Sequence, residues 1–171
     1  MNKTLLAGAP DFVVRWPELP VAAPDIDPAN AAIGPLTFGC ALEAASVFGR
    51  PTRFVGSERD YCELLYAAAG FQIDFDSGHL AYAAFFVAAD ELLPALDITF
   101  CEVRLRGIGV LTWASTPRDV EALLGPPTSR DDDPDESVWC YEMETVTVEL
   151  EFGSTGKLKR VNVFPAADDA G

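Results

Sequence analysis

The sequence contains few of the residues that common catalytic and nucleic-acid-binding sites need. His79, in the turn "SGHL", is the only histidine, and no cysteine nucleophile neighbours it, so it has no evident partners for a catalytic triad. Lys and Arg together number 12 against 27 Asp and Glu, which gives a net charge of −15. Such a chain repels nucleic-acid phosphates and anionic lipid headgroups. We therefore expect neither nucleic acid nor a membrane as a partner.

Cysteine pairs and long apolar runs are also missing. The four cysteines (Cys40, Cys62, Cys101 and Cys140) never occur as Cys-x-x-Cys, which excludes a zinc knuckle or a redox pair of that spacing and favours buried free thiols. No apolar run is long enough to cross a bilayer, and the run at residues 5–9 is too short for a signal-peptide core. We expect a cytoplasmic protein without a cofactor. Its hydrophobic content of 49% is enough for a packed core.

The chain contains an internal repeat. "IGPLTF" at residues 33–38 recurs as "IGVLTW" at 108–113, and "FGRPT" at 48–52 recurs as "LGPPT" at 124–128. Farther on, "FQIDFDSGHL" (71–80) aligns with "VELEFGSTGKL" (148–158), so that aligned residues lie 75 to 78 positions apart. This periodicity predicts two copies of one unit. The expected organisation is an N-terminal arm (1–30), a first repeat (31–96) and a second repeat (97–171).

The second repeat predicts one helix followed by an antiparallel sheet. Thr116 can cap a helix that has Pro117 in its first turn and Asp119 at its third position, and Gly125 would end it. Residues 146, 148, 150 and 152 are apolar and alternate with polar ones, including Glu149 and Glu151, which is typical of a sheet with one buried and one wet face. The expected strands are 138–143, 145–152 and 158–164, with "GSTGK" as the hairpin turn before the last.

The first repeat predicts a similar unit. A helix is expected over 42–48, ended by Gly49, and buried alternation over 71–75 leads through the turn "DSG" to a strand over 80–87. Between the repeats, 90–96 is too short and too interrupted by Pro94 for a long helix, and 98–105 is expected to be a strand. The proline-rich arm should be extended and pack through Phe12, Val14 and Trp16. The fold class is therefore α+β, with two tandem helix-on-antiparallel-sheet repeats and one open sheet face.

The second repeat also resembles a known family. "TPRDVEALLGPPTSR", "WCYE" and "VELEFGSTGKLKRVNV" resemble the helix, glycine-proline stop and strands of the small outer-membrane assembly lipoproteins (SmpA/OmlA-like). The β-lactamase inhibitor proteins look like two such units in tandem. This resemblance implies a helical layer on one face of an antiparallel sheet and an open face that binds protein. The lipidated cysteine of the lipoproteins and the paired cysteines of the secreted inhibitors are not recognisable here.

An acidic segment follows the second helix, and a calcium loop is the first alternative to consider for it. Asp131, Asp133, Asp135 and Glu142 match positions one, three, five and twelve of an EF-hand loop. The sixth position holds Glu136 where that loop needs glycine, and the expected neighbours are strands. We therefore expect no metal ligand here and interpret the segment as a surface connector before a strand.

The remaining catalytic patterns are explained by turns and solvated strands. "STGK" at 154–157 has the Ser-x-x-Lys spacing of acylating serine enzymes, but those need a helix, and this segment is a predicted hairpin turn. A phosphate-binding loop would need glycine at Glu151 and Ser or Thr at Leu158. Because no nucleophile and base pair is recognisable, we expect that the protein is not an enzyme.

Two interpretations stay open for the aromatic residues. Trp139 and Tyr141 share one strand face with Met143, so they are either core residues or anchors on an open face. On the second interpretation the partner-binding residues are Asp131, Asp132, Asp133, Asp135, Glu136, Trp139, Tyr141, Glu142, Glu144, Glu149 and Glu151. No catalytic or metal-binding residue is predicted.

The leading functional hypothesis is an inhibitor of the immunity-protein type. It would neutralise a cationic bacterial toxin, secretion-system effector or enzyme, for example a nuclease, by docking over its active site as a monomer or weak dimer. Two alternatives remain: a structural or assembly adaptor of the envelope-lipoprotein type, and a small-ligand module with a cavity between the repeats.

Overall fold

The computed structural model describes residues 3–89 and 97–167 and shows an α+β fold with two sheets. The helices are η1 (Lys3–Leu6), α1 (Asp11–Val14), η2 (Leu42–Phe48), η3 (Ala67–Ala69) and α2 (Pro117–Leu124), where η denotes a 3-10 helix. The strands are β1 (Ile26–Asp27), β2 (Ala32–Ile33), β3 (Leu36–Thr37), β4 (Arg53–Gly56), β5 (Tyr61–Tyr66), β6 (Phe71–Asp76), β7 (His79–Phe86), β8 (Val103–Leu105), β9 (Gly109–Leu111), β10 (Ser129–Asp132), β11 (Glu136–Glu142), β12 (Val146–Gly153) and β13 (Leu158–Pro165).

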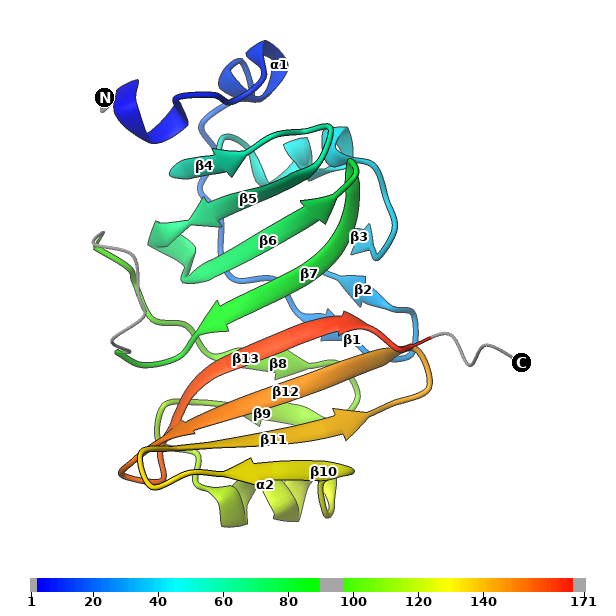
Figure 1. Cartoon of the computed structure of the whole chain (residues 1–171), viewed down its shortest axis with the longest axis vertical. Helices are drawn as coiled ribbons and strands as arrows, with labels where there is room; N and C mark the ends of the chain where they lie inside the picture. Colours follow the sequence, from blue (N-terminus) through cyan, green and yellow to red (C-terminus); the bar gives the residue numbers. More distant parts are fainter. Residues whose placement is uncertain (1–2, 90–96, 168–171) are drawn as a thin grey trace.

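The large sheet has eight strands in the order β10-β11-β12-β13-β7-β6-β5-β4. All neighbouring strands are antiparallel, and each half of the sheet is a meander of four consecutive strands. The halves join where β13 pairs with β7, from Arg160 opposite Phe86 to Val163 opposite Ala83. Figure 1 shows this junction at the middle of the molecule. From either edge of the sheet to the junction, the four strands therefore follow one another in chain order.

The small sheet has five strands in the order β3-β2-β1-β8-β9 and lies behind the large one (Figure 1). Its central strand β1 is antiparallel to β2 and parallel to β8. One main core fills the space between the sheets and includes Ile26, Leu105, Phe71 and Val161. Because strands from both halves of the chain contribute to this core, the two halves share their hydrophobic burial.

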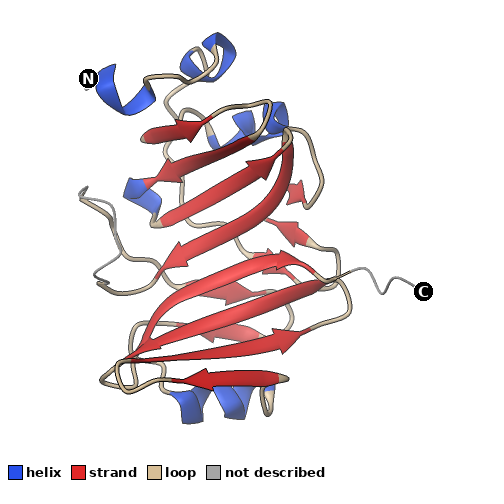
Figure 2. Ribbon diagram, viewed as in Figure 1, coloured by secondary structure: helices blue, strands red, loops and turns tan. Residues whose placement is uncertain are grey.

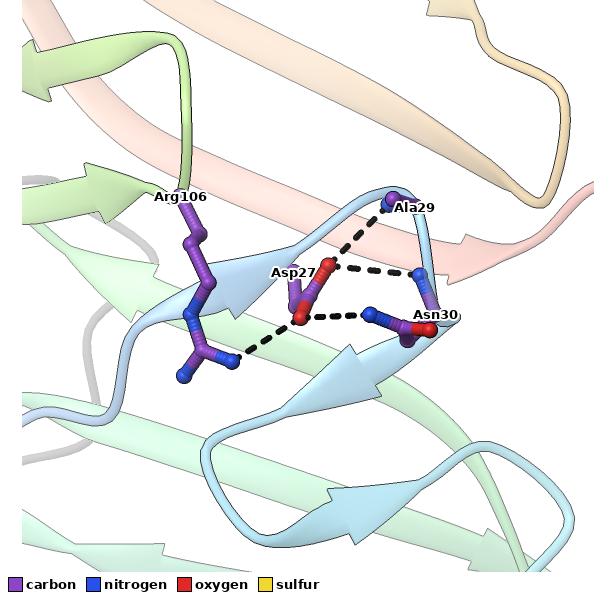
Figure 3. A network of polar contacts seen from close by, with 4 residues as sticks. All are labelled: Asp27, Ala29, Asn30 and Arg106. Carbon is purple, nitrogen blue, oxygen red and sulfur yellow. Dashed lines mark hydrogen bonds and ion pairs between the residues drawn. The ribbon is translucent and has the colours of Figure 1, made fainter.

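A buried carboxylate joins the two halves within the small sheet. Asp27 accepts hydrogen bonds from the backbone N–H groups of Ala29 and Asn30 and from the Asn30 side chain. Arg106, in the β8–β9 turn, completes the shell with an ion pair of 2.9 Å (Figure 3). The hydrogen bonds from Asn30 and the charge of Arg106 lower the pKa of Asp27 below its ordinary value of 3.8, so the carboxylate is ionised.

Helix α2 confirms the helix predicted in the second half. Thr116 accepts a hydrogen bond from the Asp119 backbone N–H, and the Asp119 carboxylate accepts one from the Thr116 backbone N–H, which forms a capping box. Pro117 is the first helical residue, and Val120 is buried. Gly125 follows with a φ of 80°, a backbone conformation that disfavours residues with a side chain.

Other predicted elements are confirmed with altered bounds or type. The strands expected over 138–143, 145–152 and 158–164 correspond to β11, β12 and β13, and the expected strand over 80–87 to β7. The helix over 42–48 is present as the 3-10 helix η2. Its N-cap residue Ala41 has no side-chain oxygen to bond the first backbone N–H groups, which removes the capping that α2 has.

Three local predictions are wrong. A strand over 98–105 was expected, but only β8 forms there, because residues 99 and 101 instead give their N–H groups to Ala67 and Phe86. The arm is not extended from its start, since η1 and α1 precede its extended part. Within α1, Val13 is buried and Val14 is exposed, because the single helical turn directs Val13 to the core. The segment 90–96 lies outside the described residues.

The expectation of buried free thiols holds fully for only one of the four cysteines. All four cysteines are free thiols, with Cys62 buried and the others half-buried. Burial raises the pKa of the Cys62 and Cys101 thiols to about 11, so both are protonated near neutral pH. In the described part of the chain, no helix has the length and apolarity needed to span a membrane.

Candidate functional site

The face of the large sheet that points away from the small sheet is the candidate functional site. Figure 2 shows the helices of the described chain behind the large sheet or at its ends, so none of them covers this face. Strand register identifies the residues on it: Val138 lies opposite Asp131 and Glu151, and Cys140 lies opposite Glu149. We call this surface the open face.

Carboxylates gather on the open face over β10, β11 and β12. Asp131, Glu149 and Glu151 project from it by register, and Glu142 lies opposite Thr147. The β10–β11 turn adds Asp133 and Asp135, and the β11–β12 turn adds Glu144, all of them exposed. The acidic segment is therefore a strand, a turn and the start of the next strand, rather than a loop alone. We call the seven carboxylates of this paragraph the acidic surface: Asp131, Asp133, Asp135, Glu142, Glu144, Glu149 and Glu151.

Several predicted carboxylates are already paired with basic side chains. Glu136 lies 3.3 Å from Lys159, and Glu151 lies 4.0 Å from the same ammonium group. Asp132 forms an ion pair of 3.2 Å with Arg130 and accepts a hydrogen bond from Ser137. For Asp131, Asp133, Asp135, Glu142, Glu144 and Glu149, the described residues provide no ion pair. These six carboxylates supply the uncompensated charge of the acidic surface.

Trp139 and Tyr141 do not belong to this surface, which corrects their assignment as partner contacts. They are 5% and 4% exposed and lie on the core face of β11, opposite Leu150 and Val148. The Trp139 ring packs against Phe152, and the Tyr141 hydroxyl donates to the Gly125 carbonyl at 3.0 Å. This face of β11 points inward because α2 and the small sheet, which form the other two sides of the core, pack their apolar side chains against it.

A polar network crosses the open face in the other half of the sheet. Asp74 on β6 is 2% exposed and accepts hydrogen bonds from Tyr61 at 2.5 Å and from Gln72 at 2.8 Å. Burial raises the pKa of Asp74 to about 6, and the nearby charge of Glu63 acts in the same direction. Burial also raises the pKa of Tyr61, so the phenol remains the proton donor in this pair.

A second set of hydrogen bonds crosses the junction between the halves. Tyr82 on β7 donates a hydrogen bond of 2.7 Å to Asn162 on β13. Asn162 in turn donates one of 2.6 Å to the Glu151 carboxylate. Both Tyr82 and Asn162 therefore have their polar atoms satisfied at a place where strands from different halves meet.

A hollow of about 340 Å³ opens on this face beside the junction. Its lining residues are Arg53, Glu63, Gln72, Tyr82, Ala84, Phe86 and Arg160. Ala84 lies in register between Gln72 and Asn162, so a methyl group stands where both neighbours have long side chains. The small side chain in a row of large ones explains why the surface is hollow there. We call this feature the junction pocket.

Sequence reasoning missed the residues of the junction pocket and the polar network. Arg53, Asp74, Tyr82, Asn162 and Arg160 come from four different strands, and no short motif connects them. The only signal was the alternation in β6, which places Gln72 and Asp74 on the polar side of a strand whose other side is apolar.

The described residues hold no cluster of metal-ligating side chains, and the one histidine makes a contact within its own turn. No group of three or more His, Cys, Asp or Glu side chains in residues 3–89 and 97–167 is placed to hold a metal ion. His79 is exposed, and its Nδ1 lies 3.0 Å from the Ser77 carbonyl, a contact within the turn itself.

No family model matches the sequence, and the comparison with curated proteins finds no match. One similar solved structure is the crystal structure of a DUF4309 family protein (YjgB) from Bacillus subtilis subsp. subtilis str. 168. The two chains are 17% identical, with a TM-score of 0.48, and the alignment covers 95% of this chain and 96% of that chain.

Proposed function

We propose that this chain is a non-enzymatic protein-binding inhibitor of the immunity-protein type, which docks its acidic surface onto a cationic bacterial toxin or effector. The observation that carries the proposal is the set of six uncompensated carboxylates on and around the open face of β10, β11 and β12. Such a surface attracts a basic protein and speeds its association at low salt. A nuclease suits this role, because its active site is already shaped to bind a polyanion.

Buried and apolar residues beneath the acidic surface support a stable docking platform. Val148, Leu150 and Phe152 fix β12 to the core, so Glu149 and Glu151 are held by a rigid strand rather than a loop. Val138 and Cys140 are half-buried between the carboxylates and offer a small apolar centre. A charged rim around an apolar centre is the usual arrangement of a transient protein interface.

We also propose that the two halves are copies of one helix-on-sheet unit, as in the tandem inhibitors that the sequence resembles. The palindromic strand order of the large sheet supports this proposal. So do matched motif positions: Leu36 and Leu111 are both buried, and Gly49 and Gly125 both follow a helix with positive φ, of 72° and 80°. On this proposal, only the second copy carries the exposed carboxylates of the acidic surface.

The test of docking is a matched pair of charge-reversal variants. One carries lysine at Asp131, Asp133, Asp135 and Glu149, and the control carries lysine at Glu43, Asp60, Asp97 and Glu102, exposed residues outside the acidic surface. Protein captured by the wild-type chain is purified, and its association rate is measured over a range of salt concentrations. The first variant should associate at least tenfold more slowly at low salt, with a weaker salt dependence, and the control should change much less. Equal rates for both variants would reject the acidic surface as the docking site.

A further inference from the structure

The junction pocket has cationic side chains, apolar walls and a volume typical of ligand-binding sites. Its volume of about 340 Å³ lies within the range of small-molecule sites, roughly 300–1,000 Å³. Ala84 and Phe86 form apolar walls, and both belong to the second, smaller apolar cluster of the protein. Two guanidinium groups, those of Arg53 and Arg160, line the same hollow. In a chain of net charge −15, two arginines in one hollow are a local exception.

The Arg53 guanidinium has unused hydrogen-bonding capacity. Its Nε is buried and has no hydrogen-bond partner among the described residues. Its nearest carboxylate is Glu63, whose Oε2 lies 3.8 Å from Nη2, which is an ion pair but too long for a hydrogen bond. A buried donor without an acceptor costs about 1–3 kcal/mol. The Arg53 side chain as a whole is 25% exposed, so part of it stays open to an acceptor in the hollow.

Arg160 forms the other side of the hollow and is held in place. Its guanidinium carbon lies 5.7 Å from the centre of the Phe86 ring, and its Nε lies 3.7 Å from a Glu151 oxygen. These contacts orient a planar cation along the wall of the hollow.

We propose that the junction pocket binds the carboxylate of a small organic molecule, with Arg53 as its main hydrogen-bond donor and Ala84 and Phe86 against its apolar part. A guanidinium matches a carboxylate in shape and offers two parallel donors. Glu63 and Glu151 stand beside the two arginines, so a singly charged group is favoured over a phosphate dianion. The residues that line the pocket are not part of the acidic surface, although Glu151 of that surface contacts Arg160, and the proposal does not depend on the docking function.

Benzoate tests the proposal, because it carries one carboxylate on a flat apolar body and has benzamide as a neutral equivalent. Binding is followed by calorimetry and by NMR shifts of the Gln72 and Ala84 amides. Benzoate should bind saturably and at least about tenfold more tightly than benzamide, because only the anion forms charge-assisted hydrogen bonds. Arg53→Gln should weaken benzoate binding about 10- to 100-fold, whereas the control Arg104→Gln, an exposed arginine on β8, should leave it unchanged.

Glu63→Gln provides a second variant that keeps the fold and gains rather than loses binding. It removes the competing carboxylate beside Arg53, so benzoate should bind several-fold more tightly. The proposal is overturned if acetate, benzoate and succinate all fail to bind up to about 10 mM. It is also overturned if phosphate binds more tightly than benzoate, or if Arg53→Gln and Arg104→Gln have the same effect.

Discussion

Tyr82 and Asn162 stand 80 residues apart in the chain and share a hydrogen bond of 2.7 Å across the junction of the large sheet. Asn162 is only 4% exposed, so its amide has little access to water. The bond therefore satisfies a buried polar group at the one place where the two halves of this sheet pair directly.

Removing this bond should destabilise the protein. Tyr82→Phe deletes the donor and leaves the Asn162 oxygen buried without it, so the free energy of unfolding should fall by about 1–3 kcal/mol. A double-mutant cycle with Asn162→Ala measures the coupling by denaturant titration. Additive losses for the two substitutions would show that the two side chains do not interact.

The capping box of α2 predicts a smaller and more local effect. Thr116→Ala removes the acceptor for the Asp119 backbone N–H and should lower the free energy of unfolding by about 1 kcal/mol. Ser at the same position keeps the acceptor and should restore most of the stability. Chemical denaturation of both variants provides the comparison, and equal stability of the Ala and Ser variants would argue against the cap.

The ionisation of Asp74 should make the free energy of unfolding increase as pH falls. Because burial raises its pKa in the folded protein to about 6, above the ordinary value of 3.8, the folded protein binds its proton more tightly than the unfolded chain does. The contribution of Asp74 to stability therefore improves as pH falls from about 7 to about 4, and the ionised group is a cost above pH 6.

Asp74→Asn removes this cost. At pH 7.5 the variant should be more stable than the wild type by on the order of 1–2 kcal/mol, and the gain should disappear near pH 4. The measurement is the free energy of unfolding of both proteins across this pH range. A gain that is independent of pH would assign the effect to packing rather than to ionisation.

The ionisation of Asp27 should have the opposite effect on the pH dependence of stability. Its pKa is lowered in the folded protein, so it contributes stability above about pH 4 that is lost as pH falls through its lowered pKa. Arg106→Gln removes the ion pair that Figure 3 shows, and the variant should unfold at a higher pH than the wild type during acid titration. Arg104→Gln, on the same sheet and exposed, is the control. An unchanged acid transition in Arg106→Gln would contradict a stabilising role for the pair.

Helix α2 and strand β12 were well predicted from the sequence, for identifiable reasons. The cap at Thr116, the stop at Gly125 and the strict alternation over β12 are local signals, and these two elements form as their own residues predict. The type of η2 was less predictable, because Ala41 offers no cap and tertiary packing decides the conformation.

The missed features depend on partners distant in sequence. Strand β10 is polar along its whole length and forms only because it pairs with β11, so periodicity could not indicate it. Alternation in β11 separated Trp139 from its charged neighbours but could not say which face would be covered. The junction pocket arises only when β4, β7 and β13 are assembled, so its arginines carry no signal in the sequence.

The central claim is that the acidic surface of β10, β11 and β12 contacts a basic protein partner. A photo-crosslinking residue at Val138, at the centre of this surface, tests that contact directly, with the same residue at Arg104 on the small sheet as the matched control. We predict a crosslink to the captured partner from position 138, weakened by salt, and none from position 104. Crosslinking from position 104 but not from position 138 would contradict the account.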